Sequence, residues 1–135
     1  MGKGIAIEAD LQDGLFVFAD MTQVDKILNN YLSNALSHVS KGGRITVRTE
    51  NVDSEIKVRV YNDGEAVPPE AMERIWESFY RGDSSHKRES DRVGLGLSIV
   101  KAAVAMHETH CGVVNKPQGV EFWFTLKVSP SQTEI

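Results

Sequence analysis

The 135-residue sequence contains a single cysteine, Cys111, which excludes an internal disulfide and favours a reducing, cytoplasmic setting. No apolar run approaches the roughly 18–20 residues that cross a bilayer, and residues 1–4 are not followed by the apolar segment of a signal peptide. A basic excess is also absent. The 15 Lys and Arg residues against 19 Asp and Glu residues give a net charge of −4, which argues against a general nucleic-acid binder.

Apolar residues recur with two different periods. A stripe at helical spacing runs from Val24 to Val39, behind a capping signal at Asp20 and Gln23, and predicts one long helix. Residues 44–50 and 56–61 alternate between apolar and polar side chains, which predicts an antiparallel hairpin with one wet face. Weaker signals predict strands at 5–7, 15–18, 112–114 and 121–128, a short helix at 69–76 and a helix from Leu97 onward.

The segment 80–93 is almost free of apolar residues and carries several basic ones. A polar loop of this length inside a compact domain is uncommon and is usually functional or mobile. Because repeats and linkers are absent, residues 1–135 read as one α+β domain, with helices on one face of a mixed, largely antiparallel sheet and residues 129–135 as a frayed tail.

Three short motifs could carry chemistry. Asn30 and Asn34 lie four residues apart on one side of the predicted long helix. Their bland interpretation is two surface residues; their functional one is that an amide oxygen suits Mg²⁺ beside phosphates. Asp63 lies in an Asn-Asp-Gly turn, whose bland interpretation is only a turn; its functional one is acceptance of a hydrogen bond from an exocyclic amine such as that of adenine. Residues 94–97, Gly-Leu-Gly-Leu, immediately precede a predicted helix, and helix starts bind anions.

Two other patterns are set aside. His107 and His110 are three residues apart and do not have the zincin spacing, so chance explains them better than a metal site. Cys111 has no partner cysteine and is interpreted as a small core residue.

Taken together, four ordered segments resemble the ATP-binding catalytic domain of sensor histidine kinases, within the superfamily of gyrase, Hsp90 and MutL ATPases. Residues 30–35 resemble the N box, 62–68 the G1 box, 76–81 the F box and 92–101 the G2 box. The resemblance covers roughly residues 5–128. It implies an α/β sandwich of three helices on a mixed, largely antiparallel sheet, with ATP under a mobile lid.

The resemblance also implies ATP and Mg²⁺ as ligands. Asn34 is then the Mg²⁺ ligand, and Asn30 is its companion facing the phosphates. Asp63 reads the adenine, with Gly64 and Val67 against the base. The remaining residues begin the lid or close on the triphosphate: Phe79, Tyr80 and Arg81, then Gly94, Leu95, Gly96 and Leu97.

Some positions depart from the family pattern. Ser37 stands where a Lys is usual, so Lys41 or a lid arginine has to supply the phosphate cation. His38 replaces an aromatic residue and can still stack on a purine. Ala66 replaces the second Gly of the G1 box and Arg92 the first Gly of the G2 box. These departures predict a site that still binds nucleotide, but with weaker affinity.

No sequence of the family's phosphoacceptor type, a His followed by Glu or Asp on a helical hairpin, precedes residue 5. The chain is therefore expected to be a catalytic fragment of a protein-histidine kinase. We expect the isolated domain to be monomeric, and its parent protein to be anchored in a membrane with this domain on the cytoplasmic side. Its expected partners are the His-bearing dimerisation domain of the parent and a downstream response regulator. An anti-sigma-factor serine kinase and a non-catalytic nucleotide-sensing module remain as alternatives.

Overall fold

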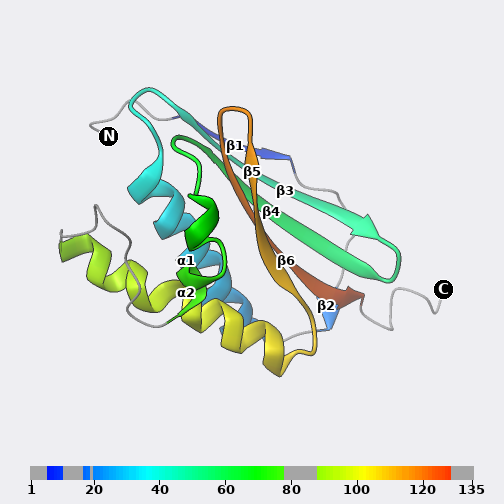
Figure 1. The fold of residues 1–135 in the computed structure, drawn as a ribbon. Coiled ribbons are helices and arrows are strands. Elements are labelled where there is room, and N and C mark those ends of the chain that lie inside the picture. The colour runs from blue at the N-terminus through cyan, green and yellow to red at the C-terminus, as the bar shows by residue number, and fades with distance from the viewer. Residues whose placement is uncertain (1–5, 11–16, 19, 78–87, 129–135) are drawn as a thin grey trace.

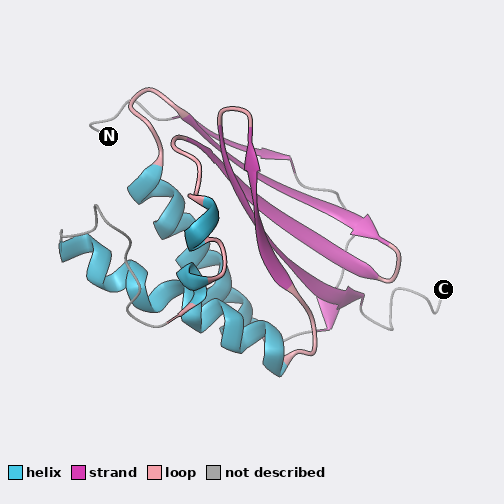
Figure 2. Ribbon diagram, in the orientation of Figure 1, coloured by secondary structure: helices cyan, strands magenta, loops and turns pink. Residues whose placement is uncertain are grey.

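The computed structural model describes residues 6–10, 17–18, 20–77 and 88–128, which form two layers. A twisted sheet makes one layer, and two long helices with two short 3-10 turns cover one of its faces (Figures 1 and 2). The α+β class and the mixed, largely antiparallel sheet that the sequence predicts are confirmed. Within the described part, no helix is both long and apolar enough to cross a membrane.

The strands of the sheet are β1 Ala6–Asp10, β2 Val17–Phe18, β3 Arg44–Val52, β4 Glu55–Asp63, β5 Cys111–Lys116 and β6 Gly119–Val128. Their order is β1-β3-β4-β6-β2, and β5 also pairs with β6. β1 runs parallel to β3, and all other pairs are antiparallel. β5 pairs with residues 119–124 of β6, and β2 with the last two residues of β6.

The first helix, α1 (Met21–His38), begins as its capping signal predicts. The Asp20 carboxylate accepts hydrogen bonds from the backbone N–H groups of Thr22 and Gln23. These bonds satisfy donors that a helix N-terminus otherwise leaves without partners.

The apolar stripe of α1 packs against α2 (Arg88–Met106) and the sheet. The core side chains come from both layers: Val24, Ile27, Tyr31, Ala35, Val39, Ile45, Val58, Val60, Leu97, Val100, Ala103, Val104, Val120, Phe122, Phe124 and Leu126.

Two predicted helices differ from the structure. Residues 69–76 form two 3-10 turns, η1 (Pro69–Ala71) and η2 (Arg74–Trp76), in place of one short helix. The N–H groups of Ala71 and Glu77 donate to the carbonyls three residues earlier, those of Pro68 and Arg74, as in the 3-10 turns that commonly serve as short connectors. α2 begins at Arg88, so the predicted loop 80–93 is helical from residue 88 and residues 94–97 lie inside the helix, not at its start. Residues 88–92 are all polar in the sequence, so this extension of the helix leaves no apolar periodicity to detect.

His107 joins the end of α2 to the start of α1. Its Nε2 accepts a hydrogen bond from the Asp20 backbone N–H at 3.0 Å, and Nδ1 lies 3.0 Å from the carbonyl oxygen of Ala103. Both bonds can form together only when the proton is on Nδ1. His107 therefore has a structural role, and the described residues contain no group of three or more His, Cys, Asp or Glu that could hold a metal ion.

We predict that His107→Ala lowers the free energy of unfolding by about 1 kcal/mol, because it removes two backbone-directed hydrogen bonds at a half-exposed site. Urea unfolding followed by circular dichroism measures this change. His110→Ala is the matched control, because the His110 side chain is exposed, and we expect it to unfold like the native chain. Equal unfolding midpoints for the two variants would contradict the assigned role.

Candidate functional site

The two long helices are in contact, and Asn30 of α1 lies beside Gly96 of α2. A Cβ atom placed on Gly96 would lie 2.8 Å from Oδ1 of Asn30, so any side chain there would push this amide aside. The Nδ2 atom of Asn30 donates to the Lys26 carbonyl one turn earlier, at 2.7 Å. The structure thus brings together two of the predicted site residues, one from each helix.

Asn34 lies one turn beyond Asn30 and is only 5% exposed. Its side-chain amide makes no hydrogen bond to any described residue. Buried amides in folded proteins nearly always have partners. Asn34 is therefore a buried polar group on the same helix side as Asn30 whose amide is not satisfied by the described residues.

The end of α1 meets the end of β4. The Ser40 backbone N–H donates to the Asp63 carbonyl at 3.0 Å. Gly64 adopts a φ of +150°, and a Cβ there would lie 2.6 Å from the His38 carbonyl oxygen. The turn after β4 therefore needs glycine both for its backbone conformation and for this close contact.

The alternation along β4 separates Asn62 from Asp63. Asn62 pairs with Ile45 on one side and Val120 on the other, both buried core residues, and is itself 2% exposed. Its Nδ2 donates to the Asp63 carbonyl, and its Oδ1 accepts no hydrogen bond from a described residue. Asn62 therefore faces the helical layer, on the side where Asn30 and Asn34 lie.

Asp63 points to the opposite face of the sheet, which changes the interpretation drawn from the sequence. One carboxylate oxygen accepts from the Arg44 backbone N–H at 2.8 Å, and the other accepts from the Tyr61 hydroxyl at 2.5 Å. These three residues line a polar hollow on the helix-free face. Successive side chains of a strand alternate between the faces, so Asp63 cannot share a ligand with Asn34.

The hydrogen bond from the Tyr61 hydroxyl to Asp63 is retained at neutral pH, because the hydroxyl stays protonated. Partial burial and the hydrogen bond to the Asp63 carboxylate raise the pKa of Tyr61 to about 12. The hydroxyl therefore remains a donor, and Asp63 is best described as a structural residue that ties the end of β4 to the start of β3.

The loop 64–68 is held to the β5–β6 hairpin at both of its ends. The Gly64 N–H donates to the Gln118 carbonyl at 3.0 Å. The side-chain amide of Asn115 accepts from the Val67 N–H and donates to the Val67 carbonyl, both at 2.9 Å. Val67 packs against the core, and Ala66 is exposed between these fixed points.

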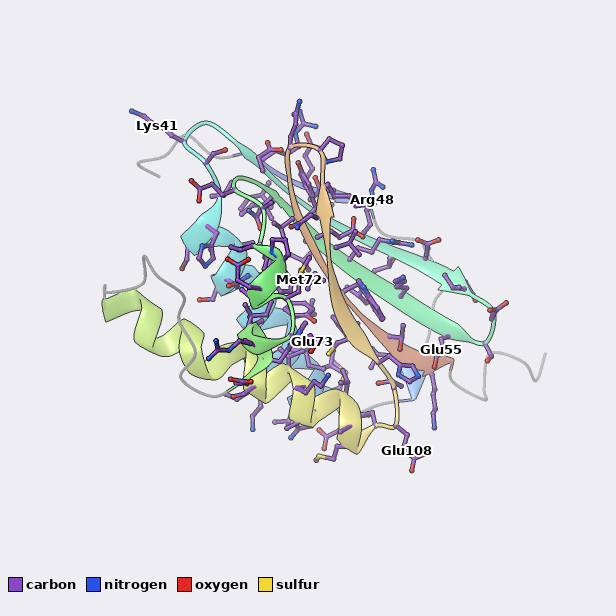
Figure 3. The ribbon with its side chains drawn as sticks, in the orientation of Figure 1. Lys41, Arg48, Glu55, Met72, Glu73 and Glu108 are labelled. Carbon is purple, nitrogen blue, oxygen red and sulfur yellow. The ribbon has the colours of Figure 1, made fainter. Side chains whose placement is uncertain are left out.

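The remaining site residues predicted from the sequence are spread over several elements. Lys41 is exposed and projects away from the molecule in the loop after α1, as Figure 3 shows. His38 is exposed at the end of α1, and Leu97 is a core residue at 4% exposure. Arg92, Gly94 and Leu95 lie within α2, whereas Phe79, Tyr80 and Arg81 lie outside the described residues.

Two residues of this candidate site, Asn62 and Asn115, were not predicted from the sequence. The signal for Asn62 was available, because it continues the buried series of Ile56, Val58 and Val60 at period two. Asn115 had no comparable signal, because its contact to Val67 joins residues 48 positions apart.

Comparisons with known proteins show which family the chain belongs to. Residues 19–130 match the family described as histidine kinase-, DNA gyrase B-, and HSP90-like ATPase. The sensor histidine kinase CusS of Escherichia coli (strain K12) is 37% identical over 110 residues, 82% of this chain and 23% of CusS. The sensor-like histidine kinase SenX3 of Mycobacterium tuberculosis (strain H37Rv) is 34% identical over 122 residues, 90% of this chain and 30% of SenX3. The chain thus spans about a quarter of the length of these relatives.

Solved structures give the same result. The catalytic domain of histidine kinase ThkA superposes with a TM-score of 0.80 at 26% identity, covering 93% of this chain and 81% of that one. The mycobacterial sensor histidine kinase MprB gives a TM-score of 0.82 at 27% identity, covering 94% and 86%. The chain therefore belongs to the histidine kinase-, DNA gyrase B- and HSP90-like ATPase family, as an ATP-binding domain of the sensor histidine kinase type.

Proposed function

We propose that this chain binds Mg-ATP and presents the γ-phosphate to a histidine on a separate dimerisation domain of a longer, membrane-anchored parent kinase. The observation that carries the proposal is the buried amide of Asn34, which has no hydrogen bond to a described residue. Leaving such a group without a partner costs about 1–3 kcal/mol. A ligand that bound there would compensate for this cost.

The donor set at this place fits a hard divalent cation. Mg²⁺ prefers oxygen ligands and is usually held by one or two protein groups together with phosphate oxygens. Asn34 would supply one amide oxygen, and the Oδ1 of Asn30 faces the backbone of Gly96 beside it. When bound, Mg²⁺ would neutralise charge on the phosphates.

The base would bind at the other end of the site, near the end of β4. Asn62 offers an Oδ1 that no described residue uses, suited to accept a hydrogen bond from the exocyclic amine of adenine. Asn62 thus takes the role that the sequence analysis gave to Asp63. Val67, half-buried and fixed by its backbone, would provide an apolar contact for the ring.

Phosphoryl transfer on such a site is mainly a matter of positioning and charge neutralisation. Ser37 is exposed and uncharged, and Lys41 points outward, so the triphosphate would depend on Mg²⁺ and on basic residues of the segment 81–92. Two structural neighbours support this assignment: full-length ShkA, solved in complex with AMPPNP, at 29% identity and a TM-score of 0.80, and ThkA, solved in complex with the response regulator TrrA.

We predict that the isolated chain binds Mg-ATP with micromolar to millimolar affinity, as measured by calorimetric titration. It should form no phosphohistidine by itself and should transfer phosphate when the dimerisation domain is supplied in cis or in trans. The absence of binding at millimolar ATP would refute the proposal. ATP binding without transfer in the full-length parent would favour a non-catalytic nucleotide-sensing module, and transfer to a serine of a small antagonist protein would favour the anti-sigma type.

A second prediction separates the two residues at the end of β4. Asn62→Ala should weaken ATP binding about tenfold, because a buried acceptor for the base is lost. Asn62→Asp should largely retain binding, because it keeps an acceptor at the same place. Asp63→Asn should stay within about twofold of the native chain, because its side chain lies on the other face. The reverse order of effects in the same titration would return the base contact to Asp63.

A third prediction concerns how much the buried amide of Asn34 lowers the free energy of unfolding of the protein without nucleotide. Asn34→Leu replaces the amide by an apolar group of the same shape, and we expect it to raise the free energy of unfolding by about 1 kcal/mol while abolishing Mg-ATP binding. Asn29→Leu is the control, because Asn29 is exposed on the same helix and reports helix propensity alone. Urea unfolding in the absence of nucleotide compares the two. A smaller gain at residue 34 than at residue 29 would mean that the amide is satisfied.

A further inference from the structure

The β5–β6 hairpin is joined to the loop 64–68 by a side chain as well as by backbone. The carboxamide of Asn115 bonds both the N–H and the carbonyl of Val67, each at 2.9 Å. A planar amide that pairs with both groups of one residue acts as a neighbouring strand would. Pro68 follows Val67 and restricts the backbone of Val67 to an extended conformation. The two hydrogen bonds from Asn115 then hold this extended residue in place against the hairpin.

We propose that Asn115 is a positioning residue for nucleotide binding, one that sets the place of Val67 against the base without touching the nucleotide. This inference rests on the proposed function, because it gives Val67 its contact with adenine. Gly64, at the other end of the loop, is held by a backbone carbonyl that any sequence would provide. Asn115 is therefore the point at which a change of side chain alters the geometry of the loop.

The surroundings of Asn115 support this division of roles. Its side chain is exposed, and it pairs through its backbone with Val120 on β6, so its removal leaves no cavity in the core. Glu65 and Ala66 are exposed between the two fixed ends of the loop. When Asn115 is absent, Val67 keeps its apolar contacts but loses both backbone partners, and the loop becomes free to shift under the base.

The test compares Asn115→Ala, Asn115→Asp and the native chain by NMR titration, which resolves weak binding. Asn115→Ala should weaken Mg-ATP binding about five- to tenfold, which is the range expected for two lost hydrogen bonds acting on one contact. Asn115→Asp keeps an acceptor for the Val67 N–H and should fall between the two. Asn51→Ala, at the exposed far end of β3, is the matched control and should bind like the native chain.

Two further readouts separate positioning from general loosening. Amide exchange at Val67 should become faster in Asn115→Ala, because its N–H loses its acceptor. Binding of Mg-tripolyphosphate, which has no base, should be unchanged.

Equal ATP affinity in Asn115→Ala and the native chain would overturn the role of Asn115 and leave the proposed function standing. Equal weakening toward ATP and tripolyphosphate would overturn it too, because it would reveal a general disturbance. A native chain that binds no Mg-ATP would instead refute the proposed function itself.

Discussion

The absence of a side chain at Gly96 is the constraint on which the contact between α2 and Asn30 depends. With a Cβ there, α2 would meet Oδ1 of Asn30 at 2.8 Å, and the amide would have to move. Glycine at this position therefore lets α2 pack beside Asn30 while its amide keeps the hydrogen bond to the Lys26 carbonyl. A residue without a side chain thus makes room for a polar group between the two helices.

The sheet contributes a second constraint, which is the strict alternation of β4. Asn62 and Asp63 are adjacent in sequence, yet one faces the helices and the other a polar hollow on the open face. The strand thereby performs two tasks with consecutive residues. Asn62 offers the helical side an acceptor that no described residue uses. Asp63 fastens β4 to β3 through the backbone N–H of Arg44 and also holds the hydroxyl of Tyr61 on its own strand.

The class of the fold, the long helix and the hairpin could be predicted from the sequence, because local periodicity and capping carry that information. The start of α2 could not, because residues 88–92 are polar on all sides and show no apolar stripe. The family motif led to the turn after β4, where the structure directs Asn62 and not Asp63 toward the helices, and continuing the alternation two residues beyond Val60 selects Asn62. Asn115 depends on a contact across the sheet that no local pattern encodes.

The amide of Asn34, which no described residue satisfies, has an evolutionary consequence under the proposed function. A descendant of this chain that no longer needed its ligand would gain stability by drifting to an apolar residue at this position. Under that function, selection for ligand binding is what keeps asparagine at position 34. Descendants with the same sheet and helices but a hydrophobic residue there would be the ones to suspect of having kept the architecture after abandoning the chemistry.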